Sequence, residues 1–175
     1  MNTRVAGLLM AVVAVCGGVV TVGCTQSVSG RAVVNETERA AYVTAAAATS
    51  SSKAKAARGA VCAEFVVHAL KVQGKIDALK RRLDEKADRT TTLGAARDAG
   101  TALDDASEAV ASSLRNNSVD AGLNTTMSEY STAAEAFGKE MTKMSLGTGD
   151  QTTFATAQTR YFAAKNAGAS ACGPS

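Results

Sequence analysis

The stretch that decides the fold is VDAGLNTTMSEYSTAAEAFGKEMTKM, residues 119–144. Its apolar side chains recur every three or four residues, which is the period of one face of an α-helix. These positions are Val119, Leu123, Met127, Tyr130, Ala134, Phe137, Met141 and Met144. The pattern is the most regular in the chain, and it predicts a helix that packs this face against a core.

The sequence on either side repeats this spacing and predicts three more helices. The first covers residues 56–86, with its stripe at Cys62, Phe65, Val66, Ala69, Val72, Ile76, Leu79 and Leu83. The second covers residues 92–115, with Thr90 to Thr92 as candidate N-caps and its stripe at Leu93, Ala96, Ala99, Leu103, Ala106, Val110 and Leu114. The fourth begins at a capping Asp150 and continues to about Gly168, with its stripe at Phe154, Ala157, Tyr161 and Ala164.

Four helices joined by short turns favour an antiparallel up-down-up-down bundle, so the predicted fold class is all-α. Alternating strand patterns of useful length are missing after residue 35, and the single proline, Pro174, interrupts no helix. Aromatic residues make up only 4% of the chain and Trp is absent. The core must therefore be built from small side chains on helices that approach closely.

The N-terminus has the pattern of an export signal. A short segment with one positive charge, Met1 to Arg4, precedes the uncharged run Val5 to Val22. The Gly17-Gly18 pair weakens this run as a helix, and it ends in small residues at Cys24 instead of a basic stop-transfer flank. These features indicate a signal peptide in preference to a membrane-spanning helix.

The tetrapeptide Thr21-Val22-Gly23-Cys24 resembles the lipobox of bacterial lipoproteins, although Thr21 stands where Leu is usual. The resemblance implies cleavage between Gly23 and Cys24 and attachment of diacylglycerol, palmitate among its acyl chains, to the Cys24 thiol. Two or three acyl chains hold a protein that one chain would release. An uncleaved anchor and ordinary secretion remain as alternatives.

The residues after the cysteine, CTQSVSGRA at 24–32, are similar to the start of small mycobacterial exported lipoproteins. The resemblance covers residues 1–34 only. It implies a lipid-anchored protein on the extracytoplasmic face of the cell membrane. It carries over no activity and no functional residue beyond Cys24.

The composition then divides the chain into three parts. Residues 1–23 form the signal peptide, residues 24–52 a lipidated cysteine with a flexible tether, and residues 53–175 the helical bundle domain. Within the tether, Glu36 to Val43 can form a short helix, whereas TAAAATSSS at 44–52 is typical of a flexible stalk. The stalk is either an unmodified spacer or an O-glycosylated one.

Two cysteines remain after processing, Cys62 and Cys172. An exported pair is expected to form a disulfide in an oxidising compartment. In an up-down-up-down bundle, the start of the first helix and the end of the fourth lie at the same end, so the two positions agree with the fold. Free or redox-active thiols are the alternative, but no CxxC motif supports them.

Several residues are of the types that carry chemistry, but they fit structural roles better. His68, the only histidine, lies at the edge of a stripe near Glu64 and Lys71. The carboxylates Asp104, Asp105 and Glu108 lie within about one helical turn, but no other reactive residue type converges on them. The positive charge of Lys80-Arg81-Arg82 is offset by Asp84 and Glu85, which follow it closely. We expect no catalytic residue, no cofactor and no metal site, and hence no enzyme.

The leading functional hypothesis is a membrane-anchored extracytoplasmic lipoprotein whose helical bundle binds an envelope protein or lipid. One alternative is a carrier that holds an apolar ligand or lipid in an interhelical groove, and another is a phage-type or prophage-type lipoprotein that blocks a surface receptor. A formal net charge of only +3 gives no reason to expect a nucleic-acid partner.

Overall fold

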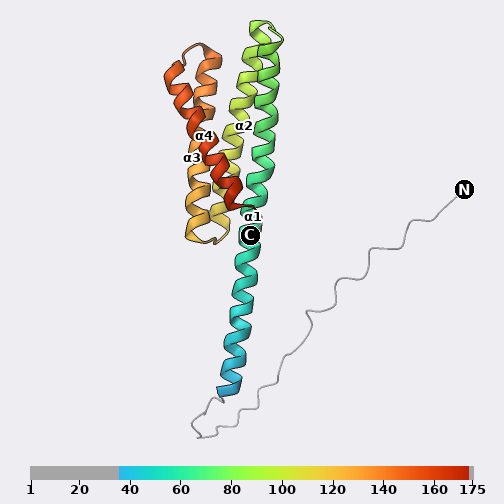
Figure 1. Ribbon diagram of the computed structural model, residues 1–175, viewed down its shortest axis with the longest axis vertical. Helices are drawn as coiled ribbons and strands as arrows, with labels where there is room; N and C mark the ends of the chain where they lie inside the picture. The colour runs from blue at the N-terminus through green and yellow to red at the C-terminus, as the bar shows by residue number, and fades with distance from the viewer. Residues whose placement is uncertain (1–35, 174–175) are drawn as a thin grey trace, which may run out of the picture.

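A computed structural model describes residues 36–173, and these residues form four helices without a strand (Figure 1). Helix α1 runs from Glu36–Asp84, α2 from Arg89–Asn116, α3 from Ala121–Leu146 and α4 from Gln151–Ala171. The predicted all-α four-helix bundle is therefore confirmed. Gly23 and Cys24, with the rest of the predicted signal peptide and lipobox, lie outside the described residues.

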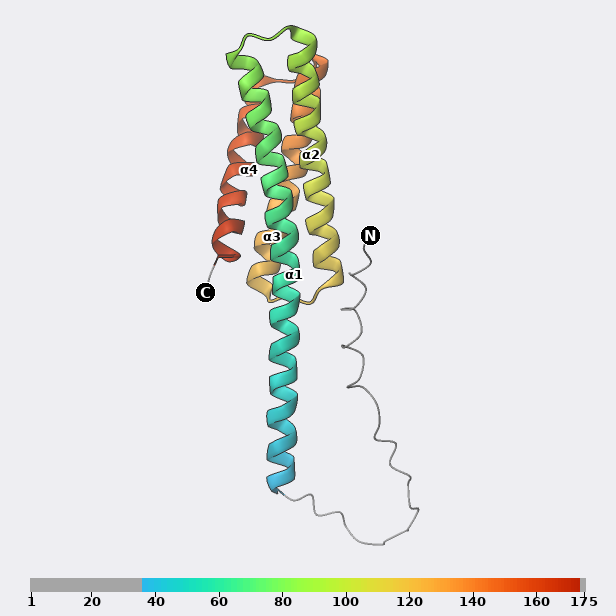
Figure 2. The ribbon, with the colours of Figure 1, turned by 90° about the vertical axis from the view of Figure 1, so that its right-hand side faces the viewer.

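The helices alternate in direction along the bundle, and each packs on its neighbour in sequence (Figures 1 and 2). The α2–α3 pair forms the most extensive contact, α1 packs on α2, and α4 packs on α3. In contrast, the backbones of α1 and α4 seldom come close, and the darkest red turn in Figure 1 is where the end of α4 meets α1. The bundle is thus closed at one end and looser along the rest of the α1–α4 seam.

Three aspartates begin the last three helices. The side chains of Asp88, Asp120 and Asp150 each accept a hydrogen bond from the backbone amide three residues later. The predicted cap at Asp150 is thus present, but the expectation that Thr90 to Thr92 cap the second helix is wrong. Asp88 is preferred because its carboxylate accepts from both the amide and the hydroxyl of Thr91.

Helix α1 begins much earlier than the predicted start at residue 56 and continues through the segment expected to be a flexible stalk. The segment contains neither proline nor glycine between residues 36 and 58, and alanine has the highest helix propensity. The hydroxyls of Thr44 and Thr49 donate to the carbonyls four residues earlier, so they add hydrogen bonds inside the helix. Every residue from Glu36 to Ala56 is exposed, and none packs on the bundle.

The predicted stripes form most of the core, with four exceptions, one of which is Met144 near the end of α3, 37% exposed. Val61 is fully buried although it lies outside the predicted stripe of the first helix. Val66 is 45% exposed because it lies on the side of α1 that turns away from the other helices. Leu83 is 57% exposed because the α1–α2 hairpin reaches beyond the α3–α4 turn (Figure 1).

Small residues let α2 and α3 approach closely. A Cβ atom built on Gly138 would lie 3.0 Å from the carbonyl oxygen of Gly100 on α2. Nearby, the buried hydroxyls of Ser107 and Ser131 lie 3.0 Å apart, and the Ser131 hydroxyl also donates to the Ser107 carbonyl at 3.0 Å. The α2–α3 pair is therefore held by close backbone contact and by hydrogen bonds between the helices as well as by apolar packing.

We predict opposite effects for two glycine-to-alanine changes. Gly138→Ala places its methyl group 2.5 Å from Oδ1 of Asp104 as well as against Gly100, so α2 and α3 must separate. The expected cost is about 1–3 kcal/mol of unfolding free energy. Gly94→Ala is the matched control: outside its chain neighbours and the backbone of its own helix, no atom lies within 4 Å of the new methyl group, and higher helix propensity should add up to about 1 kcal/mol. Urea denaturation measures both, and equal effects would contradict the close α2–α3 contact.

The three capping aspartates predict a loss of stability in acid. Hydrogen bonds from the Thr91 hydroxyl and amide, the Leu123 amide and the Thr153 amide and hydroxyl hold the pKa of Asp88, Asp120 and Asp150 below the usual 3.8. Because the folded-state pKa lies below the unfolded one, the stabilisation is complete above about pH 4 and is lost as pH falls through the folded values.

The urea concentration at the unfolding midpoint should accordingly decrease as the pH is lowered from about 4 to about 2. A chain with Asp88→Asn, Asp120→Asn and Asp150→Asn keeps capping oxygens that do not titrate, so its midpoint should fall less over this range. Identical pH profiles for the two chains would show that the caps contribute nothing to the acid dependence.

Candidate functional site

A disulfide joins the bundle at one end. Cys62 on α1 and Cys172, the residue that ends α4, are bonded, and their Cα atoms lie 5.5 Å apart. The structure therefore contains the predicted disulfide at the predicted end of the bundle. It links residues separated by 110 positions and closes the seam in which α1 and α4 otherwise make few contacts.

Arg58 reinforces the same end of the bundle, and the sequence reasoning missed it. Its guanidinium donates to the carbonyl of Ala171 in the last turn of α4 and forms an ion pair with the capping Asp120, at 3.3 Å. A cation is favoured beside the C-terminal carbonyls of a helix. In the sequence, Arg58 lies one helical turn before Cys62. That position indicates a contact with the end of α4 only when Cys172 is known to be the disulfide partner of Cys62. We call Arg58, Cys62, Asp120, Ala171 and Cys172 the clasp.

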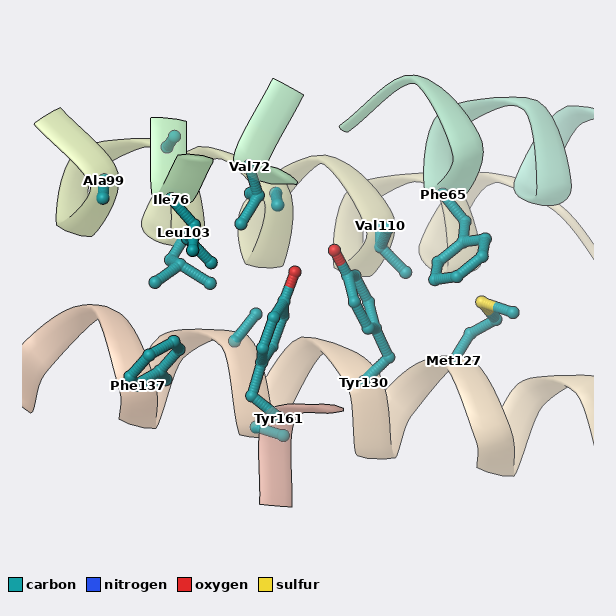
Figure 3. Close-up of a cluster of buried hydrophobic side chains, with 14 of the residues drawn as sticks. Phe65, Val72, Ile76, Ala99, Leu103, Val110, Met127, Tyr130, Phe137 and Tyr161 are labelled. Atoms are coloured by element: carbon teal, nitrogen blue, oxygen red, sulfur yellow. The ribbon is translucent and has the colours of Figure 1, made fainter. Parts of the chain in front are cut away.

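The interior beyond the clasp is filled by a row of aromatic rings (Figure 3). Phe65 from α1 meets Tyr130 from α3 with ring centroids 4.8 Å apart and an edge-to-face angle of 83°. The row continues through Tyr161 of α4 to Phe137 of α3, with centroid distances of 5.9 and 5.5 Å. Aromatic residues are scarce in this chain, so their concentration here gives the small-residue core most of its bulk.

The two core tyrosines carry the most unusual polar groups of the interior. Both hydroxyls point from α3 and α4 toward α1 (Figure 3), and apart from each other they have no polar neighbour that bonds to them among the described residues. Burial raises the pKa of Tyr130 and of Tyr161, and the neighbouring phenol raises the pKa of Tyr161 further. Both phenols therefore stay protonated at physiological pH.

His68 lies at the edge of the core, as its position in the sequence indicated. Its Nε2 atom lies 3.5 Å from Oε2 of Glu64 on the same helix, and its Nδ1 atom is buried without a partner in the described part of the chain. Lys71, the other residue near it in sequence, instead pairs with Asp105 at 2.7 Å. The histidine therefore lies beside Glu64, whereas Lys71 pairs elsewhere.

The acidic residues of α2 point to separate partners. Asp105 pairs with Lys71 of α1, whereas Glu108 pairs with Arg115 at 2.8 Å. Asp104 lies against α3, where burial and the Glu135 carboxylate raise its pKa. Within residues 36–173, no group of three or more His, Cys, Asp or Glu side chains is arranged to hold a metal ion.

The remaining surface features are open to solvent. Lys80, Arg81 and Arg82 are exposed near the end of α1, and Arg82 pairs with Glu85 at 3.4 Å. One shallow hollow lies along α4 alone, and a second lies between α2 and α3 near the turn that joins them. Of the helices that the structure describes, none combines the length and the apolar character needed to cross a bilayer.

The described residues thus define a disulfide-closed, antiparallel four-helix bundle with an extended first helix. Residues 44–173 match the family model described as the Rv2240c four-helix bundle domain, and the chain therefore belongs to that family. Its mycobacterial name agrees with the resemblance of residues 24–32, whereas the match begins after the lipobox. No curated protein and no solved structure matches the chain significantly.

Removing the disulfide should lower stability without changing the fold. A cross-link that closes a loop of this length stabilises by about 4–5 kcal/mol on the chain-entropy model, so reduction should lower Tm substantially. The helical circular dichroism signal at 25 °C should stay nearly unchanged, because the apolar stripes and not the bond select the fold. Cys62→Ser and Cys172→Ser should be equally destabilising, and the double variant should cost little more than either. Clearly additive losses would show that the two thiols act separately.

Proposed function

We propose that this protein is a lipid-anchored, extracytoplasmic interaction module of the cell envelope, held to the membrane through Cys24. The observation that carries the proposal is the Cys62–Cys172 disulfide. Structural disulfides persist in oxidising compartments outside the cytoplasm, which is where a processed lipobox at residues 21–24 would place the domain. The two features are far apart in sequence and support the same location.

The shape of α1 supports a role away from the membrane surface. The exposed segment Glu36–Ala56 precedes the bundle and, as a helix, has a length of roughly 30 Å. It leads away from the bundle at the clasp end, so that the α1–α2 and α3–α4 turns lie at the far end (Figure 2). Leu83 and Leu146 are exposed in the helix turns beside them, by 57% and 63%. The segment would hold this distal end outward for a partner in the envelope.

A binding role suits the side chains better than catalysis does. The residue types that could carry chemistry do not converge on one site. They are the histidine, the acidic residues of α2 and the basic run, and they lie on different faces. The buried phenols stay protonated. A carrier for an apolar ligand is less well supported, because the interior between the helices is occupied by the aromatic row. The proposal therefore names a protein or lipid component of the envelope as the partner and assigns the protein no enzymatic activity.

The anchor is tested by Cys24→Ser. The parent chain, expressed with its signal peptide in an actinobacterial host, should partition into the detergent phase and show a mass increase from acyl chains at its N-terminus. Cys24→Ser should move to the aqueous phase, because no thiol remains to carry the lipid. Cys16→Ser is the matched control and should behave like the parent. An unmodified Cys24, or a mature N-terminus elsewhere, would overturn the anchoring proposal.

A further inference from the structure

The distal end of the α1–α2 hairpin carries positive charge that its surroundings do not balance. Along the body of the bundle most cations pair with a carboxylate, at Arg58–Asp120, Lys71–Asp105, Lys75–Asp98, Arg115–Glu108, Lys139–Glu135 and Lys143–Glu140. At the end of the hairpin, the exposed cations without a carboxylate partner in residues 36–173 are Lys80, Arg81, Lys86 and Arg89. We call residues 79–93 the tip.

The acidic residues of the tip leave part of this charge uncompensated. Glu85 pairs with Arg82 at 3.4 Å, and the Asp88 carboxylate accepts hydrogen bonds from Thr91 as the cap of α2. Asp84 is the remaining carboxylate of the tip. The offset that the sequence suggested is therefore incomplete, and the tip offers unpaired cations to an anionic partner.

Lys86 holds a backbone conformation that favours glycine. Its φ of 51° lies in the left-handed region, and no other residue except glycine has a positive φ among residues 36–173. The backbone amides of Lys86 and of the next residue donate with the same spacing as those of Gly147 and its successor at the end of α3. Arg81 and Arg82 already place cations in the last turn of α1, so the helix end requires no third. A strained lysine in this exposed turn indicates a role for its charge.

An apolar side chain lies on the inner side of the tip. Leu83 follows Ile76 by two helical turns and so lies on the core face of α1, yet it is 57% exposed, because the hairpin reaches beyond the α3–α4 turn (Figure 1). Leu79 of α1 and Leu93 of α2 are each only half-buried. The core surface of the hairpin therefore continues past the ends of α3 and α4, where no described helix covers it.

We propose that the tip binds an amphipathic helix of another envelope protein, whose apolar face covers Leu83 and whose acidic side chains pair with Lys86 and Arg89. Such a helix occupies the space beyond the α3–α4 turn, and its apolar face extends the core of the bundle. The inference deepens the proposed function and rests on it for one point only, the location of the partner outside the cytoplasm.

The position of Leu83 favours a helix over a lipid surface. Its side of α1 faces the other hairpin, so a flat anionic bilayer that met the tip end-on would contact the loop after α1 and leave Leu83 in water. The chain outside residues 36–173 cannot supply the acidic side chains, because residues 1–35 and 174–175 contain no Asp or Glu. An acidic segment of a different protein is therefore the occupant that fits the charge and the shape of the tip.

Two synthetic peptides test the proposal by fluorescence anisotropy. Both are amphipathic helices with a leucine face, and their polar faces carry glutamate in one and lysine in the other. The full lipidated chain in nanodiscs of zwitterionic lipid should bind the acidic peptide and not the basic one, and added NaCl should weaken the binding by screening the ion pairs. The Cys24→Ser chain in buffer should bind the acidic peptide equally well, so a failure of binding is distinguishable from a failure of the anchoring proposal.

Two matched pairs of variants locate the binding. Arg89→Glu reverses a charge in the tip, whereas Arg160→Glu reverses an exposed cation of α4 that also has no carboxylate partner in the described chain. Leu83→Ser removes the exposed leucine of the tip, and Leu70→Ser removes one that is 68% exposed in the middle of α1. Each tip variant should raise the Kd for the acidic peptide by about tenfold, through a lost ion pair or lost apolar burial. The two controls should leave the Kd nearly unchanged.

Lys86→Gly separates binding from folding. Glycine relieves the left-handed backbone, so the urea concentration at the unfolding midpoint should rise. The lost charge should nevertheless raise the Kd for the acidic peptide by about threefold. A lysine with a purely structural role would leave the Kd unchanged.

Three results would overturn the proposal: no binding of the acidic peptide at millimolar concentration, equal binding of the basic peptide, or equal losses in the tip variants and their controls. Phosphatidylglycerol vesicles that bind the Cys24→Ser chain through Arg89, when the acidic peptide does not, would assign a lipid surface in its place. Self-association of the chain that Leu83→Ser abolishes would assign the tip to a second copy and overturn the proposal as well.

Discussion

The close approach of α2 and α3 at Gly100 and Gly138 is the contact on which the bundle depends. The core has few aromatic side chains and no Trp, so large side chains fill little of its volume. Its helices must therefore come close for small side chains to exclude water. The two glycines set the distance between α2 and α3. The hydrogen bonds between Ser107 and Ser131 hold the two helices at this distance where no apolar side chain lies between them. Helices α1 and α4 then pack on the outside of this central pair, one on each partner.

That arrangement leaves one weak seam, between α1 and α4, and the clasp closes it. The Cys62–Cys172 bond supplies there the stabilisation that the other helix pairs obtain from packing. A contribution of about 4–5 kcal/mol is a large part of the stability of a domain of this size. Arg58 adds a charged contact from α1 to the last turn of α4 and to the first turn of α3. Farther along, α1 and α4 are joined by Lys165, which donates to Gln73 at 2.7 Å.

The sequence predicted those features that follow from periodicity and covalent chemistry. The four helices, their order and most core positions follow from apolar spacing, and the disulfide follows from counting the cysteines that the predicted processing would leave. The extension of α1 was missed because Ser and Thr in 44–52 are typical of flexible segments, whereas here their hydroxyls bond within the helix. Arg58 could not be assigned, because its partners come from two other helices. The exposure of Leu83 depends on the unequal lengths of the two hairpins, which no local pattern contains.

A continuous α1 also changes the role of the region before the bundle. A flexible stalk would let the bundle turn freely, whereas a helix fixes both its height and its rotation about the helix axis. Each residue added to a helix turns the rest of that helix by roughly 100°. The segment from Glu36 to Ala56 packs on no helix of its own bundle, so it contributes nothing to the core. What its length and helical form determine is the position and orientation of the bundle at its end.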